Sequence, residues 1–136
     1  MVTSTNRFEH QNQTRLIEGT INASLIWQFR LSSELTFVSS TLELNGAPIA
    51  SDTGVFTQFR DKYAVNLVQS SEISVTLVIF EVTAAHDTIF SCEVFAREQG
   101  VISWKSNVQV DVFGKIFLCE RFNFKYVQVL LLSNVQ

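Results

Sequence analysis

The chain has 136 residues, of which 46% are hydrophobic and 17% are charged, and it contains twelve phenylalanines but only one proline. This composition favours a single folded, β-rich domain over a disordered chain. The net charge of −3, without a long cluster of basic residues, argues against nucleic acid as a partner.

Residues 1–14 are polar and show no sustained period, so we expect them to form a flexible lead-in. They lack the apolar run of a secretory signal, and the apolar stretch at 126–136 is too short to span a membrane as a helix. Either the true start and a membrane anchor are missing from this chain, or the protein stays inside the cell. The glycosylation sequons at Asn12 and Asn22 favour the first option.

Apolar and polar residues alternate from residue 21 onwards, which is typical of a half-buried strand. Ala23, Leu25, Trp27 and Phe29 share one face of this strand. A further strand is predicted over 37–44, followed by a return strand. The dipeptide between them, Asn45-Gly46, predicts a tight hairpin, because both central residues of a type I′ turn need a positive φ.

The stretch 75–96 predicts two antiparallel strands joined by a short corner. Leu77 and Ile79 lie in the first strand, and Phe90 precedes Cys92 by two residues in the second. Their alternation directs the Cys92 thiol into the core, where a cysteine acts as a small hydrophobe with a raised pKa and little reactivity. A last strand is predicted between Val101 and Val112.

This spacing resembles the E–F region of immunoglobulin-superfamily domains, which reads Leu-x-Ile-x-x-Val and then Asp-x-Gly-x-Tyr-x-Cys. The Asn45-Gly46 hairpin is similar to the C–C′ hairpin of variable-type domains, with Leu42 in the place of the usual tryptophan. The resemblance implies a variable-type domain over residues 15–114, an all-β sandwich of two antiparallel sheets with Greek-key connections. Six residues are then expected in its core: Trp27, Leu42, Leu77, Ile79, Phe90 and Cys92.

The resemblance also implies two departures from the family pattern. Trp27 stands where the first cysteine of the inter-sheet disulfide would be, so the usual bridge is absent. His86 occupies the corner position of an aspartate that usually pairs with a strand D arginine, here Arg60; Asp87, one residue later, is the alternative partner.

Residues 115–136 lie outside the resemblance and are rich in aromatic and aliphatic residues. They are either an added strand that covers the sandwich or an artefact of the gene model. Whether Cys119 in this tail pairs with Cys92 is left open.

The sequence contains no motif for catalysis, a cofactor or a metal. His10 and His86 are isolated, and no phosphate-binding loop, nucleophile elbow or zinc motif occurs. We therefore expect no enzymatic activity, no cofactor, no metal and no nucleic-acid partner.

The candidates for a partner-binding site follow the second strand of the corner: Arg97, Glu98, Gln99 and Trp104. Tryptophan and arginine are enriched at binding hot spots. Alternatively, Trp104 closes the end of the sandwich. Ile26, Val78, Phe80 and Phe95 place apolar side chains on outward faces, which suggests a protein-contact face or a covering layer.

The resemblance implies an extracellular or cell-surface recognition module of an adhesion or immune-type receptor, without catalysis. Such domains bind a protein ligand on another cell, or an identical chain, through the sheet with the C, C′, F and G strands. Two alternatives stay open: a carbohydrate-binding β-sandwich and an intracellular structural sandwich domain.

Overall fold

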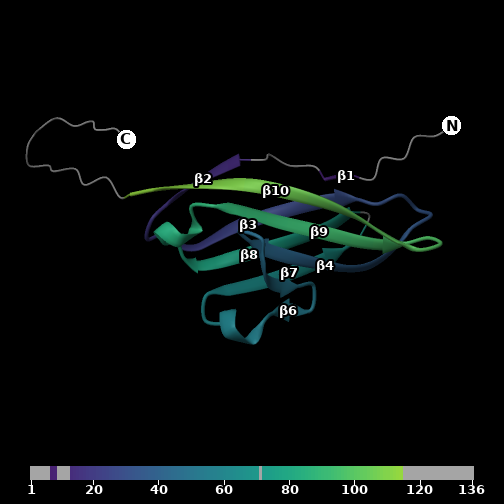
Figure 1. The fold of residues 1–136 in the computed structure, drawn as a ribbon, viewed down its shortest axis with the longest axis horizontal. Helices are drawn as coiled ribbons and strands as arrows, with labels where there is room; N and C mark the ends of the chain where they lie inside the picture. The colour runs from purple at the N-terminus through teal and green to yellow at the C-terminus, as the bar shows by residue number, and fades with distance from the viewer. Residues whose placement is uncertain (1–6, 9–12, 71, 115–136) are drawn as a thin grey trace, which may run out of the picture.

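The computed structural model describes residues 7–8, 13–70 and 72–114 as a sandwich of two sheets (Figure 1). The four-stranded sheet has the order β1-β3-β8-β7, and the six-stranded sheet has the order β2-β10-β9-β4-β5-β6. The first comprises β1 (Arg7–Phe8), β3 (Ile21–Arg30), β8 (Glu72–Glu81) and β7 (Tyr63–Gln69). The second comprises β2 (Gln13–Ile17), β10 (Val101–Phe113), β9 (Ile89–Arg97), β4 (Thr36–Leu44), β5 (Ala47–Ser51) and β6 (Gly54–Val55).

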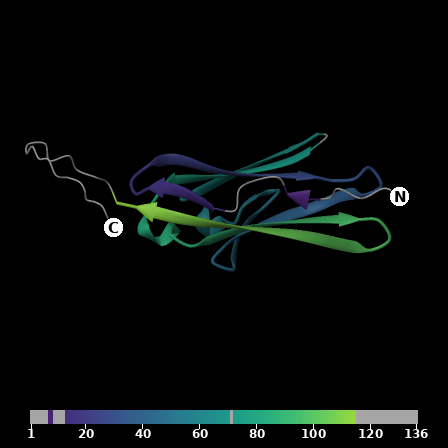
Figure 2. The ribbon, with the colours of Figure 1, turned by 90° about the horizontal axis from the view of Figure 1, so that it is seen from above.

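The predicted all-β sandwich is confirmed, with one correction to its pairing. All strand pairs among the described residues run antiparallel except β2 and β10, which run parallel from Gln13 opposite Gln109 to Ile17 opposite Phe113. The six-stranded sheet is therefore mixed. Seen from above, the strands of both layers run roughly along the long axis of the molecule (Figure 2).

The strands form where the sequence alternates, because a sandwich buries one face of each sheet. In β3 the buried residues Ala23, Leu25, Trp27 and Phe29 alternate with exposed ones, whereas in β8 buried residues alternate with half-buried ones. Two short 3₁₀ helices, η1 (Thr57–Phe59) and η2 (Ala84–His86), complete the described secondary structure.

The core lies between the sheets and receives side chains from both. Trp27, Leu77 and Ile79 come from the four-stranded sheet, and Leu42, Phe90 and Cys92 come from the six-stranded one. Each of these six is at most 1% exposed. Burying one large apolar side chain contributes about 1.5–3 kcal/mol, so this cluster is a main source of stability.

The hairpin between β4 and β5 has the predicted backbone. Asn45 and Gly46 adopt φ values of 52° and 83°, as a type I′ turn requires. The Asn45 N–H also donates to the Ile89 carbonyl at 2.8 Å, which fixes the turn against β9.

Four residues of the predicted lead-in belong to strands. Arg7–Phe8 forms β1 against β3, and β2 begins at Gln13, so residues 7–8 and 13–14 are part of the sheets. Asn12 and the tail 115–136 lie outside the described residues. Among the described residues, no helix has the length and apolar character needed to cross a membrane.

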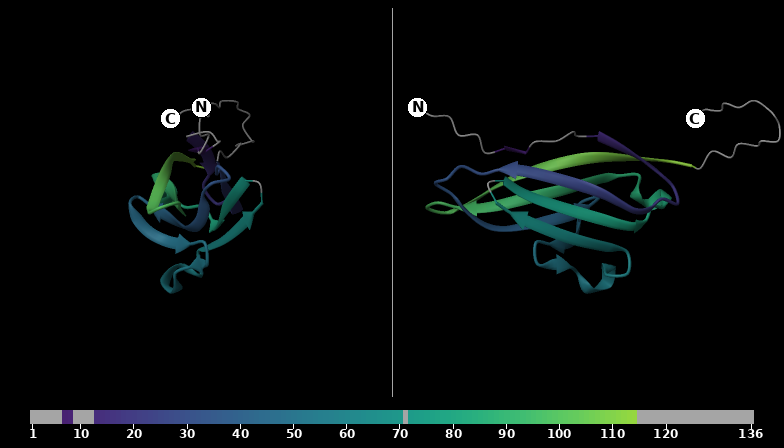
Figure 3. Two further views of the ribbon diagram at one scale, coloured as in Figure 1. Left: turned by 90° about the vertical axis from the view of Figure 1, so that its right-hand side faces the viewer. Right: turned by 180° about the vertical axis from the view of Figure 1, so that it is seen from behind.

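The two ends of the sandwich differ in the connections they carry. The β3–β4 loop, the β7–β8 turn and the β9–β10 turn lie at one end, and η2 lies at the other (Figures 1 and 3). Loops held at one end of a rigid sandwich can form a joint surface.

Candidate protein-binding face

The solvent side of the six-stranded sheet is centred on β9, which lies between β10 and β4. Val94 and Ala96 are fully buried. Because successive side chains of a strand point to opposite faces, Phe95 and Arg97 point away from the core. We call this side the outer face. It comprises Ser39, Thr41, Glu43, Ser91, Glu93, Phe95, Arg97, Ser103, Lys105 and Asn107.

Phe95 is the aromatic residue at the middle of the outer face. Its cross-strand neighbours are Ser39 on β4 and Ser103 on β10. Both neighbours are small, so the half-buried ring has no large side chain beside it along this row. A partner can therefore reach the ring from the solvent side.

Charged and polar groups surround this ring in hydrogen-bonded pairs. Lys105 Nζ contacts Glu43 Oε1 at 3.0 Å, and the Ser103 hydroxyl donates to Glu93 Oε2 at 2.8 Å. The hydrogen bond and charge of Glu43 raise the pKa of Lys105, so the Lys105 ammonium group stays charged at neutral pH. The rim of the outer face is therefore polar and pre-ordered.

Three of the four predicted contact residues lie together at the β9–β10 turn. Arg97, Glu98 and Gln99 are exposed, and the Glu98 N–H donates to the Gly100 carbonyl at 3.2 Å to close the turn. Arg97 extends the outer face from Phe95 towards this end of the molecule.

Trp104 does not join these residues, and the prediction that its ring is exposed is wrong. It lies on the core side of β10, is half-buried, and its ring centroid is 5.1 Å from that of Phe29 on β3. Phe8 on β1 packs on the same Phe29 ring at 4.8 Å. The indole thus closes the end of the sandwich, which is the alternative that the sequence left open.

The alternation of Trp104, Ser106, Val108 and Val110 in the sequence is the signal that places the indole inward. The sequence placed Phe95 on an outward face, but it did not place the ring at the centre of that face, because its neighbours on β4 and β10 are distant in sequence.

Cys92 lies beneath the outer face and carries a free thiol. Burial, with a smaller effect of the Glu93 charge, raises its pKa to about 12. The thiolate is the nucleophilic form, so Cys92 is unreactive in the folded chain. Among the described residues, no group of three His, Cys, Asp or Glu side chains is arranged to hold a metal ion.

The corner between β8 and β9 contains a buried histidine in place of the expected ion pair. The Thr83 N–H donates to His86 Nδ1 at 2.9 Å, so the proton of the neutral ring is on Nε2, which donates to the Tyr63 hydroxyl at 2.9 Å. Burial, and to a lesser extent the charge of Lys62, lower the pKa of His86. The ring is therefore neutral near pH 7.

Neither Arg60 nor Asp87 forms the ion pair considered from the sequence. The Arg60 Nε–H donates to the Val55 carbonyl at 3.3 Å. Asp87 Oδ2 accepts from the Val112 N–H at 3.0 Å, which ties the corner to β10.

The solvent side of the four-stranded sheet carries the other outward apolar residues. Ile26 is 54% exposed and Val68 is 51% exposed, while Val78 and Phe80 are half-buried. Asn22, the sequon asparagine within the described residues, is exposed at the start of β3. It has the accessibility that glycosylation needs.

Comparison of the sequence with known proteins gives no match to a protein-family model or to a curated protein. Comparison of the structure does give matches. One chain of the complex of Dpr2 Ig1–Ig2 with DIP-Theta Ig1–Ig3 matches with a TM-score of 0.59 and 14% identity, over 79% of this chain and 32% of that chain. Murine CRIg has a TM-score of 0.57 and 11% identity, over 82% of this chain and 99% of that chain.

The Titin Ig tandem domains A164–A165 match with a TM-score of 0.54 and 10% identity, over 82% of this chain and 50% of that chain. This chain thus spans about a third of the matched chain in the Dpr2–DIP-Theta complex. These likenesses concern the fold, which is that of an immunoglobulin domain. β5 and β6 extend the six-stranded sheet beyond β4, as two additional strands do in domains of the variable type.

Proposed function

We propose that the chain is the extracellular recognition module of an immunoglobulin-superfamily adhesion or immune-type receptor, without catalytic activity. The domain comprises the predicted residues 15–114 together with β1 and the start of β2. Its outer face binds a protein ligand on another cell or an identical chain. The observation that carries this proposal is Phe95, an aromatic ring at the centre of a sheet face with serines on both sides.

This arrangement has the features of a protein-contact site. Aromatic residues are enriched in the cores of interfaces, and a polar rim excludes water from the central contact. Phe95 provides the ring, Arg97 provides a cation two residues further along β9, and the Glu43–Lys105 pair provides part of the rim. The structure of Dpr2 with DIP-Theta supports a protein partner, because a chain of this fold is there bound to another immunoglobulin chain.

The proposal is tested by screening the chain, displayed as a multivalent fusion, against cell-surface ectodomains and against itself. Multivalency is needed because single domains of this kind often bind weakly. In a detected complex, Phe95→Ala and Thr41→Arg should each weaken binding by about tenfold or more, since both change the centre of the outer face.

Thr76→Arg is the matched control, because Thr76 is a half-buried, mid-strand threonine on the solvent side of the opposite sheet. It should leave binding unchanged. Both variants must have the melting temperature of the unmodified chain. If binding is then lost with Thr76→Arg and kept with Thr41→Arg, the contact lies on the four-stranded sheet, which would contradict the proposal.

A second candidate is a structural domain inside the cell. It is favoured by the core, in which Trp27 and the free thiol of Cys92 replace an oxidised bridge. The fold shared with the titin domains is compatible with it. Antibody staining of intact cells separates the candidates: staining without permeabilisation supports the receptor, and staining only after permeabilisation supports the structural domain.

A further inference from the structure

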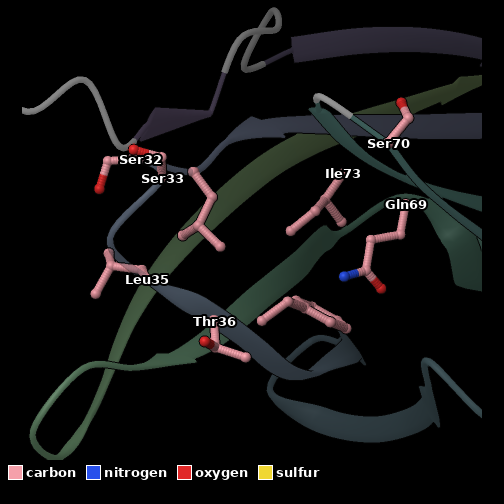
Figure 4. A pocket seen from close by; sticks show the side chains of 9 residues that line it. Ser32, Ser33, Leu35, Thr36, Gln69, Ser70 and Ile73 are labelled. Atoms are coloured by element: carbon pink, nitrogen blue, oxygen red, sulfur yellow. The ribbon is translucent and has the colours of Figure 1, made fainter.

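A cleft opens at the end of the sandwich that carries the β3–β4 loop and the β7–β8 turn (Figure 4). Its volume is about 430 Å³. Gln69 and Ile73 lie on one side, and Ser32, Ser33 and Leu35 lie on the other (Figure 4). The lining is completed by Leu31, Thr36, Phe37 and Ser70.

The lining contains no charged side chain among the described residues. Leu31 and Phe37 are half-buried and Ile73 is 3% exposed, so the inner wall is apolar. Hydroxyl and amide groups, including those of the exposed residues Ser33 and Gln69, form the rim of the cleft.

The charged residues nearest in sequence to the cleft residues do not line the cleft. Arg30 and Glu72, which precede Leu31 and Ile73, form an ion pair with one another at 3.0 Å. Glu34 is exposed and does not line the cleft. A charged ligand would therefore lose hydration without gaining an opposite charge, which is unfavourable.

The cleft adjoins one end of the outer face. Thr36, which lines the cleft, is paired across the sheet with Arg97, and Phe37 is paired with Ala96. A protein bound over Phe95 and Arg97 would consequently extend to the mouth of the cleft.

We propose that this cleft binds an uncharged aliphatic or aromatic side chain of a protein partner. The volume is within the range of about 300–1,000 Å³ that is usual for ligand pockets, so one large side chain fits. The rim hydroxyls and the Gln69 amide are placed to hydrogen-bond the flanking peptide groups. The inference deepens the proposed function, on which it rests, by naming the kind of side chain that the partner inserts.

Neutral sugars fit the cleft less well than such a side chain. A sugar would stack on the flat side of an exposed ring, and the described lining has one aromatic residue, Phe37, which is half-buried and packs against the core. The test must therefore distinguish binding of a sugar from binding of an apolar side chain.

The test is an NMR titration of the 136-residue chain with four small probes: N-acetyl-leucinamide, N-acetyl-phenylalaninamide, and the corresponding glutamate and lysine amides. The two apolar probes should shift backbone amides within 31–37 and 69–73, with dissociation constants of about 1–10 mM. The charged probes should bind about tenfold more weakly. Equal shifts with charged probes, or larger shifts with methyl mannoside, would overturn the proposal.

Gln69→Glu places a negative charge in the cleft with little change in shape. It should weaken the apolar probes about tenfold. Gln28→Glu is the matched control, since Gln28 is an exposed strand residue of the same sheet and does not line the cleft. Unchanged probe binding in Gln69→Glu, with both variants folded, would contradict the proposal.

The outcome is distinguishable from failure of the proposed function. Thr41→Arg alters the outer face and not the cleft lining, so it should leave probe binding unchanged. If the cleft binds the probes but the outer-face variants bind every partner normally, only the proposed function is refuted. If the cleft does not bind the probes, only the present inference is refuted.

Discussion

The imidazole of His86 is hydrogen-bonded at both ring nitrogens and is 5% exposed. Protonation of Nδ1 would place a new N–H opposite the Thr83 N–H, which donates to that nitrogen. The Lys62 charge further disfavours the imidazolium ion, and Asp87, the adjacent acid, is engaged with the Val112 N–H. The folded corner therefore favours the neutral ring.

Stability should consequently depend on pH near the unfolded pKa of histidine. The folded pKa of His86 is lowered from 6.5, so the unfolded chain binds more protons than the folded chain as the pH falls below 6.5. The free energy of unfolding should decrease by on the order of 1 kcal/mol between about pH 7.5 and pH 5. Urea unfolding at the two pH values measures this decrease.

His86→Gln is the control for this pH effect. Glutamine does not titrate, so this variant should be less stable than the unmodified chain at the higher pH but lose less stability on acidification. An equal loss in both chains would assign the effect to other groups.

At the scale of single elements, the β4–β5 hairpin depends on the backbone at Gly46. A β-carbon at this position would meet no atom within 4 Å, but φ is +83°, which a residue with a β-carbon adopts only with strain. Gly46→Ala should therefore lower the free energy of unfolding by about 1–2 kcal/mol, as measured by urea unfolding.

Gly100 provides the matched comparison, since it also has open space around its α-carbon but no positive φ. Gly100→Ala should leave the stability unchanged or raise it slightly. Equal destabilisation by both substitutions would show that something other than φ is responsible.

Much of the fold was predictable from the sequence because strand patterns are local. The alternation of Ala23, Leu25, Trp27 and Phe29 and the Asn45-Gly46 turn each involve only neighbouring residues, and the structure agrees with both. The resemblance of the Asn45-Gly46 hairpin and of the corner within 75–96 to immunoglobulin-superfamily domains then predicted that the strands form two stacked sheets.

The site was less predictable because it depends on residues that are distant in sequence. Phe95 becomes accessible only because Ser39 and Ser103 are opposite it, and the cleft combines residues 31–37 with residues 69–73. The parallel pairing of β2 with β10 also joins chain segments that no turn signal connects.

At the scale of the whole molecule, the described core is packed without an inter-sheet disulfide. A native disulfide in a small secreted domain contributes about 2–5 kcal/mol, which this domain must replace by packing. Trp27 is 1% exposed and contributes a large apolar surface at the position where the bridge would be. Within the described residues its Nε1–H has no hydrogen-bond partner, which reduces this gain.

Cys92 should therefore become reactive only when the whole domain unfolds. In a Cys119→Ser background, which leaves one thiol, labelling by a disulfide reagent near neutral pH should be slow in the native chain. Its rate should rise with urea in parallel with the unfolded fraction. Rapid labelling without urea would contradict the burial of this thiol and its pKa of about 12.

The parallel alignment of β2 and β10 has a mechanical consequence. β2 lies near the amino-terminal end of the domain and β10 at its carboxyl-terminal end, and they are paired over five residue positions. Tension applied through the two ends would drag these strands past each other along their length, loading all of their hydrogen bonds together instead of one at a time. The domain should therefore resist stretching far better than it would if the same strands were peeled apart from one end.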